Sequence, residues 1–446
     1  MQLSRRAALL VVLLSLCGAL PLARAEHLSQ NPAGEVQFRG QYWRDRNTRV
    51  INPAVDMERG APNGVRVGAS YLLDAITSAS VAAGAASDQP FTELRHEASL
   101  RVEVPLGFRD GRPSKHSLIA SYGYSSESDY WSHNAGLRLK LRLASENTTL
   151  MLGGDYGHNT VGRRMGPDRY LTPPLDLSPN CRLDLDTLSF ADREGCYGRL
   201  HTFHFVGYLS QILSPTLLFT LCYEITLGLG YWNNPYRPVL VLGEIMRVEN
   251  LPTQRVRHAV GLTLRKLIPL EGVLIPFVAL RPALRFHADD WGLKALSPEL
   301  AVHLPIGPLE LRAQYSFYGQ FAADFYRSEG GGRADFFTDT PIYGTGAVMR
   351  NGEPVFTSDV KMGPFTSHTV ELALTWRLSF LGDRHLFGDA PLSRTMVSLS
   401  GGAWFADRAV GWQFGIPLRR DDPSGPAGCS QTCGAFFGSL GLTLPL

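Results

Sequence analysis

Strict alternation of apolar and polar residues is the feature that most constrains the fold of this chain. Between Leu94 and Val104, apolar side chains occupy every second position, charged or hydroxyl side chains lie between them, and only His96 departs from the pattern. The same period of two returns at 135–143, 217–227, 309–317 and 370–376. Such a period belongs to β-strands that have one apolar and one polar face. The sequence therefore predicts an all-β chain.

Three further features favour a membrane barrel over a soluble sheet. Alternating segments of about 9 to 11 residues match the length that a tilted strand needs to cross a bilayer. The residues from Phe436 to Leu446 alternate strictly and resemble the terminal strand by which barrels are recognised for assembly. Aromatic residues collect at segment ends, as expected for interfacial girdles, at Tyr122, Tyr124, Tyr130, Trp131, Tyr231, Trp232, Trp291, Phe317, Tyr318 and Trp404.

These features predict a transmembrane antiparallel β-barrel of about 16 strands in the bacterial outer membrane, in contact with outer-membrane lipid and the barrel assembly machinery. Short connections such as 145–147 and 214–215 alternate with long ones, notably 157–198 and 319–362. The long connections are expected to be extracellular loops. Our strand assignment does not bring every long loop to one side, so at least one hairpin in it is misassigned.

The N-terminal residues have the pattern of a secretory signal peptide. Arg5 and Arg6 precede an apolar run and a small-x-small cleavage site that ends at Ala25. We therefore expect a signal peptide at residues 1–25 and a barrel domain at 26–446. No later stretch of about 18 apolar residues lacks a charge or a turn residue, so a membrane-spanning helix is not expected. A net charge of +2 offers no polybasic surface for nucleic acid.

Four cysteines form two pairs that are close in sequence, namely Cys181 with Cys196 in one long loop and Cys429 with Cys433 before the last strand. In an oxidising compartment, each pair can close a local disulfide. The spacing of the second pair also suits metal or redox chemistry, but no histidine lies near it in sequence. Cys222 shares a strand face with Glu224, so it is expected to point inward as a lone thiol.

The search for catalytic or metal-binding motifs is mostly negative. His201 and His204 are three residues apart, so in a strand they lie on opposite faces and do not share a metal. Asp289 and Asp290 are of the type that binds a hard cation such as calcium, although an acidic turn capped by Trp291 explains them more simply. No nucleophile elbow, P-loop or paired zinc motif is present, so the sequence predicts neither an enzyme nor a cofactor. The glutamates and arginines that face the lumen either neutralise one another or line an ion path.

Several segments resemble a family of bacterial outer-membrane β-barrel proteins that is catalogued only as a domain of unknown function. The segments are 74–80 with 91–95, Asn233 to Arg237, Glu249 to Pro252 with Arg255 to Arg257, Asp289 to Gly292, and Gln320 to Tyr326. The resemblance implies a barrel without an assigned activity. Genes of this family often accompany those of a flavin transferase and a thioredoxin-like protein, which implies a redox setting for its partners.

Three functions stay open at this point. The first is a barrel that passes or holds a small hydrophilic solute. The second is a scaffold or binding barrel for a periplasmic redox partner protein. The third, an outer-membrane enzyme, needs a constellation of histidine, serine or aspartate side chains at one barrel end, which sequence separation does not reveal.

Eight residues in or beside the resembling segments are our candidate functional residues, namely Tyr236, Arg237, Glu249, Arg255, Arg257, Asp289, Asp290 and Trp291. Pro235 and the asparagines before it favour a turn, which presents the residues that follow at a stiff corner. We expect the charged members to converge at one mouth of the barrel as a mixed-charge ring that selects solutes or seats a partner. The alternative is a salt-bridge lattice that only orders long loops.

Overall fold

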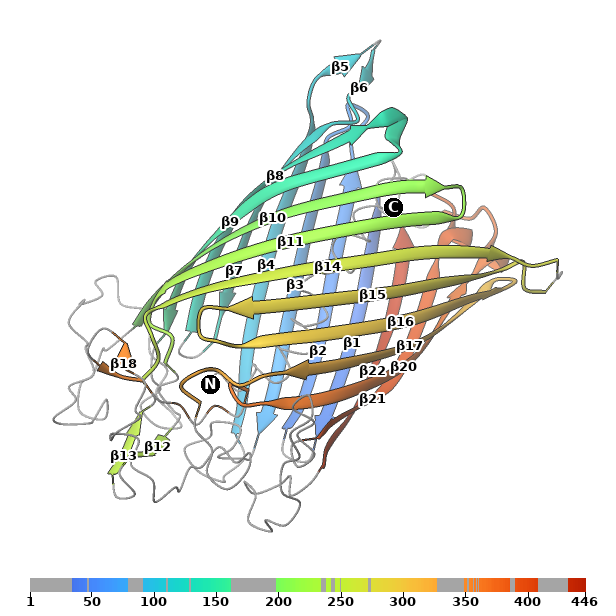
Figure 1. The fold of residues 1–446 in the computed structure, drawn as a ribbon. Coiled ribbons are helices and arrows are strands. Elements are labelled where there is room, and N and C mark those ends of the chain that lie inside the picture. The colour runs from blue at the N-terminus through green and yellow to red at the C-terminus, as the bar shows by residue number, and fades with distance from the viewer. Residues whose placement is uncertain are drawn as a thin grey trace.

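The computed structural model describes residues 34–45, 48–78, 91–109, 111–127, 130–161, 198–233, 238–241, 245–248, 250–271, 274–326, 349–350, 353–355, 357, 359, 361–385, 390–407 and 432–446. Sixteen strands in this part of the chain form one closed antiparallel barrel (Figure 1). The last strand pairs with the first, Leu442 opposing Phe38, so the sheet has no open edge. The predicted fold class and strand number are confirmed.

The strands follow one another around the barrel in sequence order. They are β1 (Glu35–Asp45), β2 (Thr48–Gly60), β3 (Arg66–Ser78), β4 (Phe91–Pro105), β7 (Ser117–Ser126), β8 (Tyr130–Leu143), β9 (Thr148–Val161), β10 (Gly198–Ser214), β11 (Leu217–Gly230), β14 (Gln254–Pro269), β15 (Phe277–Asp289), β16 (Lys294–Ile306), β17 (Leu309–Gln320), β20 (Phe365–Arg377), β21 (Met396–Asp407) and β22 (Thr432–Pro445). The barrel strands range from 10 residues in β7 to 17 residues in β10. Many are therefore longer than predicted, because tilted strands extend beyond the apolar band of a bilayer.

Alternation along each strand separates an apolar outer face from a polar inner face. In β4, the outward Leu94 and Leu100 are 48% and 49% exposed. Inward residues of β4 form ion pairs with other strands, as Arg95 does with Asp74 of the adjacent β3 and Arg101 does with Glu58 of β2. An apolar surface exposed around a closed barrel is what a lipid environment requires.

The two ends of the barrel differ. Gly34 and Leu446 lie at one end, here named the terminal end, where the Leu446 N–H donates to the Gly34 carbonyl at 2.9 Å. The connections at the opposite end, here named the loop end, comprise residues 46–47, 79–90, 127–129, 162–197, 231–253, 290–293, 321–364 and 408–431. All of the longest connections therefore leave from one end, which resolves the predicted misassignment of a hairpin.

Three small hairpins extend the barrel ends (Figure 1). The hairpin of β5 (Phe108–Arg109) and β6 (Arg112–Pro113) stands at the terminal end. At the loop end lie β12 (Pro238–Val241) with β13 (Ile245–Val248), and β18 (Met349–Arg350) with β19 (Glu353–Pro354). The described helices are the short 3-10 turns Ala144–Glu146, Ser379–Leu381 and Leu392–Arg394. Within the described residues, no helix is long and apolar enough to cross a membrane.

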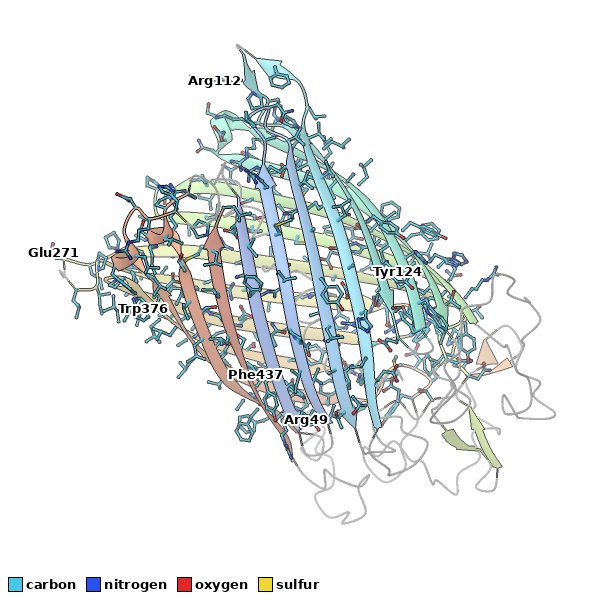
Figure 2. The ribbon with its side chains drawn as sticks, turned by 180° about the vertical axis from the view of Figure 1, so that it is seen from behind. Arg49, Arg112, Tyr124, Glu271, Trp376 and Phe437 are labelled. Carbon is cyan, nitrogen blue, oxygen red and sulfur yellow. The ribbon has the colours of Figure 1, made fainter. Side chains whose placement is uncertain are left out.

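The predicted aromatic girdle is only partly correct. Tyr122 and Tyr124 project from the outer face, where they are 49% and 36% exposed. Figure 2 shows the outer position of Tyr124. Trp291, by contrast, is fully buried in a cluster at the loop end, and Trp404 packs on the inward Trp43 with ring centroids 5.9 Å apart. Position in the sequence places an aromatic near a strand end but does not tell which side of the wall it faces.

Predictions for single residues have different outcomes. His201 contacts Tyr156 on the outer face and His204 contacts Asp155 on the inner face, so the predicted separation of the two histidines is confirmed. Cys222 is buried with its Sγ 3.6 Å from Glu224 Oε1, on the predicted inner face. The signal peptide at 1–25 and Cys181, Cys196 and Cys429 lie outside the described residues, and Cys433 lies in β22 with its side chain undescribed, so both disulfides stay predictions.

Candidate functional site

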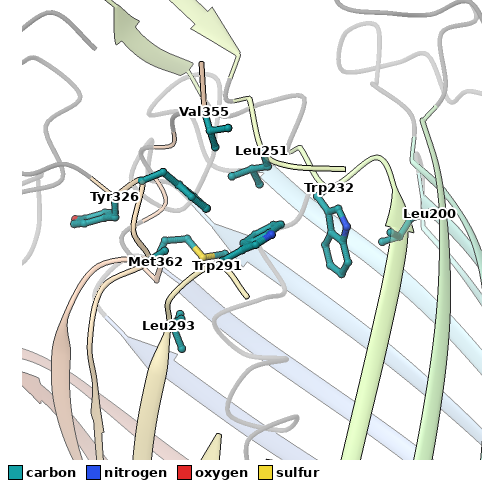
Figure 3. Packing of buried hydrophobic residues seen from close by; sticks show 10 residues of the cluster. Leu200, Trp232, Leu251, Trp291, Leu293, Tyr326, Val355 and Met362 are labelled. Atoms are coloured by element: carbon teal, nitrogen blue, oxygen red, sulfur yellow. The ribbon is translucent and has the colours of Figure 1, made fainter. Parts of the chain in front are cut away.

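A buried apolar cluster closes one side of the barrel mouth at the loop end. Its members, here named the loop-end cluster, are Leu200, Trp232, Leu251, Trp291, Leu293, Ala323, Phe325, Tyr326, Val355 and Met362. They come from the start of β10, the β11–β14 connection, the β15–β16 turn and the β17–β20 connection. Figure 3 shows Trp291 in the centre, with Trp232 on one side and Met362 and Tyr326 on the other. Segments far apart in sequence thus share one core at the mouth.

Asp289 organises the turn that carries Trp291. Its Oδ1 accepts the backbone N–H groups of Trp291 at 3.1 Å and Leu293 at 2.9 Å. A short polar side chain that binds its own backbone in this way stabilises a tight turn. Gly292 in the turn has φ +88°, a conformation that an L side chain rarely adopts, and a Cβ there would collide with Asp324. The predicted acidic turn is confirmed, and no group of three metal-binding side chains occurs among the described residues.

Arg255 joins this turn to β14. Its Nε lies 2.8 Å from Oδ2 of Asp289, whose side chain has no exposed surface, and its guanidinium lies 4.3 Å from the ring centroid of Trp291 and 5.9 Å from that of Trp232. Two aromatic rings and a carboxylate therefore surround one cation. Such an enclosed ion pair is destabilised strongly when one partner is removed, because the other charge stays buried.

Backbone hydrogen bonds attach the β17–β20 connection to the same turn. The Asp324 N–H donates to the Trp291 carbonyl at 2.8 Å, and the Phe325 ring packs edge-on against Trp291 at 5.4 Å. Gln320 Nε2 donates to the carbonyls of Lys361 and Gly363, at 2.6 Å each. The two ends of this long connection are therefore held together beside the paired strands β17 and β20.

The structure brings together only some of the predicted site residues. Trp291 belongs to the loop-end cluster, the ion pair of Arg255 with Asp289 lies against it, and Arg257 opposes Asp289 in the register of β14 and β15. Asp290 is exposed, and its Oδ1 accepts the Val256 N–H at 2.9 Å. The remaining predicted members, Tyr236, Arg237 and Glu249, lie outside the described residues. Sequence reasoning missed Trp232, Leu251, Phe325 and Met362 as cluster residues, because their shared core depends on loop packing.

Ion pairs cover most of the lumen wall. In strand order, they join Arg39 to Asp56, Arg66 and Arg101 to Glu58, Arg95 to Asp74, Lys140 to Glu103, Arg138 to Asp155, Arg285 to Glu224, Arg281 to Glu299, and Arg312 to Glu371. Every one of these pairs joins adjacent strands or two strands separated by a single strand. The lumen is therefore strongly polar, while its charges neutralise one another locally.

One part of the wall, here named the seam, lacks these pairs. Between Ser398 and Ala406 of β21 and between Ala435 and Thr443 of β22, the inward positions carry only small, hydroxyl or aromatic side chains, namely Ser398, Ser400, Gly402, Trp404, Ala406, Ala435, Phe437, Ser439, Gly441 and Thr443. Ser400 and Ser439 are hydrogen-bonded at 2.8 Å. Toward the loop end, Trp43 stacks on Phe437 with centroids 5.9 Å apart. None of these seam positions carries a charged side chain.

Residues 33–385 match the family model described as "Protein of unknown function (DUF3570)". The chain belongs to this family. The resemblance inferred from the sequence motifs is thus confirmed, and the match indicates no class of enzyme. The motif residues Asp74 and Arg95 pair at the loop end of β3 and β4, and the motifs around 255–257, 289–292 and 320–326 meet in the loop-end cluster. No curated protein matches the sequence.

Solved structures with similar folds are outer-membrane proteins. A bacterial polysaccharide outer membrane secretin aligns over 93% of this chain and 99% of its own, with 8% identity and a TM-score of 0.45. OccK2 (OpdF) of Pseudomonas aeruginosa in complex with glucuronate aligns over 93% and 98%, with 10% identity and a TM-score of 0.38. OmpT of Vibrio cholerae, in a loop L8 deletion mutant, aligns over 92% and 99%, with 7% identity and a TM-score of 0.35.

Proposed function

We propose that this protein is an outer-membrane channel that passes a small hydrophilic solute. The observation that carries the proposal is a closed barrel of sixteen strands whose inner wall is polar along its length. Barrels of about 16 to 18 strands enclose an aqueous channel unless loops fill them. Because the longest connections leave from the loop end, that end faces outward and the terminal end faces the periplasm.

The seam is the proposed path of the solute. From Ser398 to Gly402 and from Ser439 to Thr443 the seam side chains are short and uncharged, and the hydroxyls of Ser400 and Ser439 offer hydrogen bonds without a fixed charge. The aromatic side chains of Trp43, Trp404 and Phe437 lie at the outer end of this path and suit the apolar face of a hydrophilic solute. The opposite wall, with its ion pairs, excludes apolar molecules.

If the protein is a channel, discrete conductance steps are expected when the mature protein is refolded and inserted into a planar bilayer. The control is the same preparation heated until the barrel unfolds, which migrates differently in electrophoresis and conducts nothing. A correctly assembled barrel that never conducts would instead favour the scaffold for a periplasmic partner, with the packed loop-end cluster as its ordered platform.

A double substitution in the seam is expected to reduce conductance. Ser400→Arg with Ser439→Arg places two long cations in the proposed path, and we expect single-channel conductance to fall by about half or more, with cations excluded more strongly. The matched control, Ser400→Gly with Ser439→Gly, removes the hydroxyls and adds no bulk, so its conductance stays close to that of the parent. Equal conductance in the arginine and glycine variants would place the solute path elsewhere.

A further inference from the structure

Tyrosine and histidine form a repeated pair on the outer face of the barrel. The five pairs are Tyr71 with His96, Tyr122 with His133, Tyr156 with His201, Tyr223 with His258, and Tyr315 with His368, and in each the tyrosine hydroxyl lies 2.8 Å from histidine Nδ1. Each pair joins the two strands of one hairpin that closes at the loop end. Five of the eight such hairpins thus carry the same contact.

The register of the five pairs is identical. In each hairpin the residue directly opposite the tyrosine lies two positions after the histidine, as Ala98 opposite Tyr71 lies two positions after His96. Each histidine lies three to five residues from the first residue of its strand at the loop end. The pairs therefore form a belt, here named the Tyr–His belt, near the loop-end border of the apolar outer surface.

The belt is exposed and its surroundings are basic. Its tyrosines are between 40% and 49% exposed. Exposed cations share its outer face near the loop end, at Arg44, Arg49, Arg199 and Lys294. Among the described strand residues on the outer face near the loop end, the sole acidic residue is Asp407, whose side chain lies outside the described part of the structure. Charge complementarity therefore favours an anionic partner.

Because the tyrosine hydroxyl contacts Nδ1, Nε2 is the ring nitrogen that each histidine offers to its surroundings. When the hydroxyl donates to Nδ1, the neutral ring carries its proton on Nε2. When the ring is charged, Nδ1–H donates to the tyrosine oxygen and Nε2 again carries a proton. In both of these states Nε2–H is a donor on the side of the ring away from the tyrosine. A second neutral tautomer carries its proton on Nδ1 and has Nε2 as an acceptor, and an anionic partner favours the two donor states over it.

We infer that the Tyr–His belt binds the phosphate groups of membrane lipid headgroups. A girdle of tyrosine alone supplies aromatic surface at an interface, and a histidine on a lipid-facing wall is costly unless its polar atoms are satisfied. Tyrosine satisfies one ring nitrogen and a phosphate oxygen satisfies the other. The five pairs lie three to five residues from the loop-end start of their strands, as contact with one leaflet surface requires, and their binding to phosphate fixes the depth of the barrel in the membrane.

Lipid retention tests this binding. The protein in detergent is mixed with phosphatidylglycerol or with a galactolipid of the same acyl chains that lacks phosphate, and bound lipid is counted by native mass spectrometry. Replacement of all five belt histidines by phenylalanine keeps aromatic surface and removes the donors. We expect phosphatidylglycerol retention at each belt site to fall about tenfold, which corresponds to the loss of roughly one charge-assisted hydrogen bond per bound lipid. Galactolipid retention is expected to stay unchanged.

A matched pair of variants keeps the test decisive if the fivefold variant does not assemble. His133→Phe with His258→Phe removes two belt donors, and His116→Phe with His303→Phe removes two histidines that contact Arg142 and Glu310 instead. Weaker phosphatidylglycerol retention in the belt variant alone supports the inference. Equal retention in both variants, or an equal loss of phosphatidylglycerol and galactolipid, overturns it.

Discussion

Trp291→Ala is expected to destabilise the loop end by about 3–5 kcal/mol, the usual cost of truncating a fully buried tryptophan. Trp291 has no exposed surface, contacts Trp232 and Phe325, and donates from Nε1 to the Gln254 carbonyl at 2.8 Å. Its removal leaves a cavity at the point where the connections meet. The measurement is denaturant unfolding in detergent, combined with limited proteolysis of the loop-end connections.

Trp376→Ala is the matched control for this substitution. Trp376 lies on the outer face near the terminal end and is 43% exposed (Figure 2). Because it has no place in the loop-end cluster, its loss is expected to leave loop proteolysis unchanged. Equal effects of the two substitutions would contradict the role of Trp291 in holding the loop-end connections together. If Trp291→Ala also changes the ion selectivity of the channel, the cluster shapes the mouth, and unchanged selectivity favours the lattice that only orders loops.

Asp289→Ala is expected to cost about 3–5 kcal/mol, since it leaves the charge of Arg255 buried without its carboxylate. Asp289→Asn keeps an oxygen for the backbone N–H groups of Trp291 and Leu293 and removes only the charge, so a smaller loss is expected. The measurement is the free energy of unfolding of each single variant and of Asp289→Ala with Arg255→Ala. The double variant is expected to be more stable than the sum of the single losses predicts.

Asp290→Ala serves as the control for the acidic turn. Its exposed carboxylate accepts one backbone N–H, from Val256, so we expect a loss of about 1 kcal/mol. A loss at Asp290 as large as that at Asp289 would show that the turn, and not the buried ion pair with Arg255, supplies the stability of the loop end.

The barrel could be predicted from local sequence because its rule is local. A period of two along Leu94 to Val104 places apolar side chains on one face whatever the neighbouring strand is, and Leu94 and Leu100 do lie outside. The environment of the candidate site residues could not be predicted from this local rule. Trp291 was predicted at an interface and is buried, because the packing of the β17–β20 connection, through Phe325 and Met362, decides its environment.

His96 shows most clearly which features the sequence alone does not predict. The sequence by itself determined that this chain forms a barrel with alternating faces, and it marked His96 as a polar residue at an apolar position. Only the tertiary structure decided why, because the partner of His96 is Tyr71 on the adjacent strand and four other hairpins repeat the contact. The physical reason is that side-chain period is fixed within a strand, whereas cross-strand contacts depend on register, which turns and loop packing set.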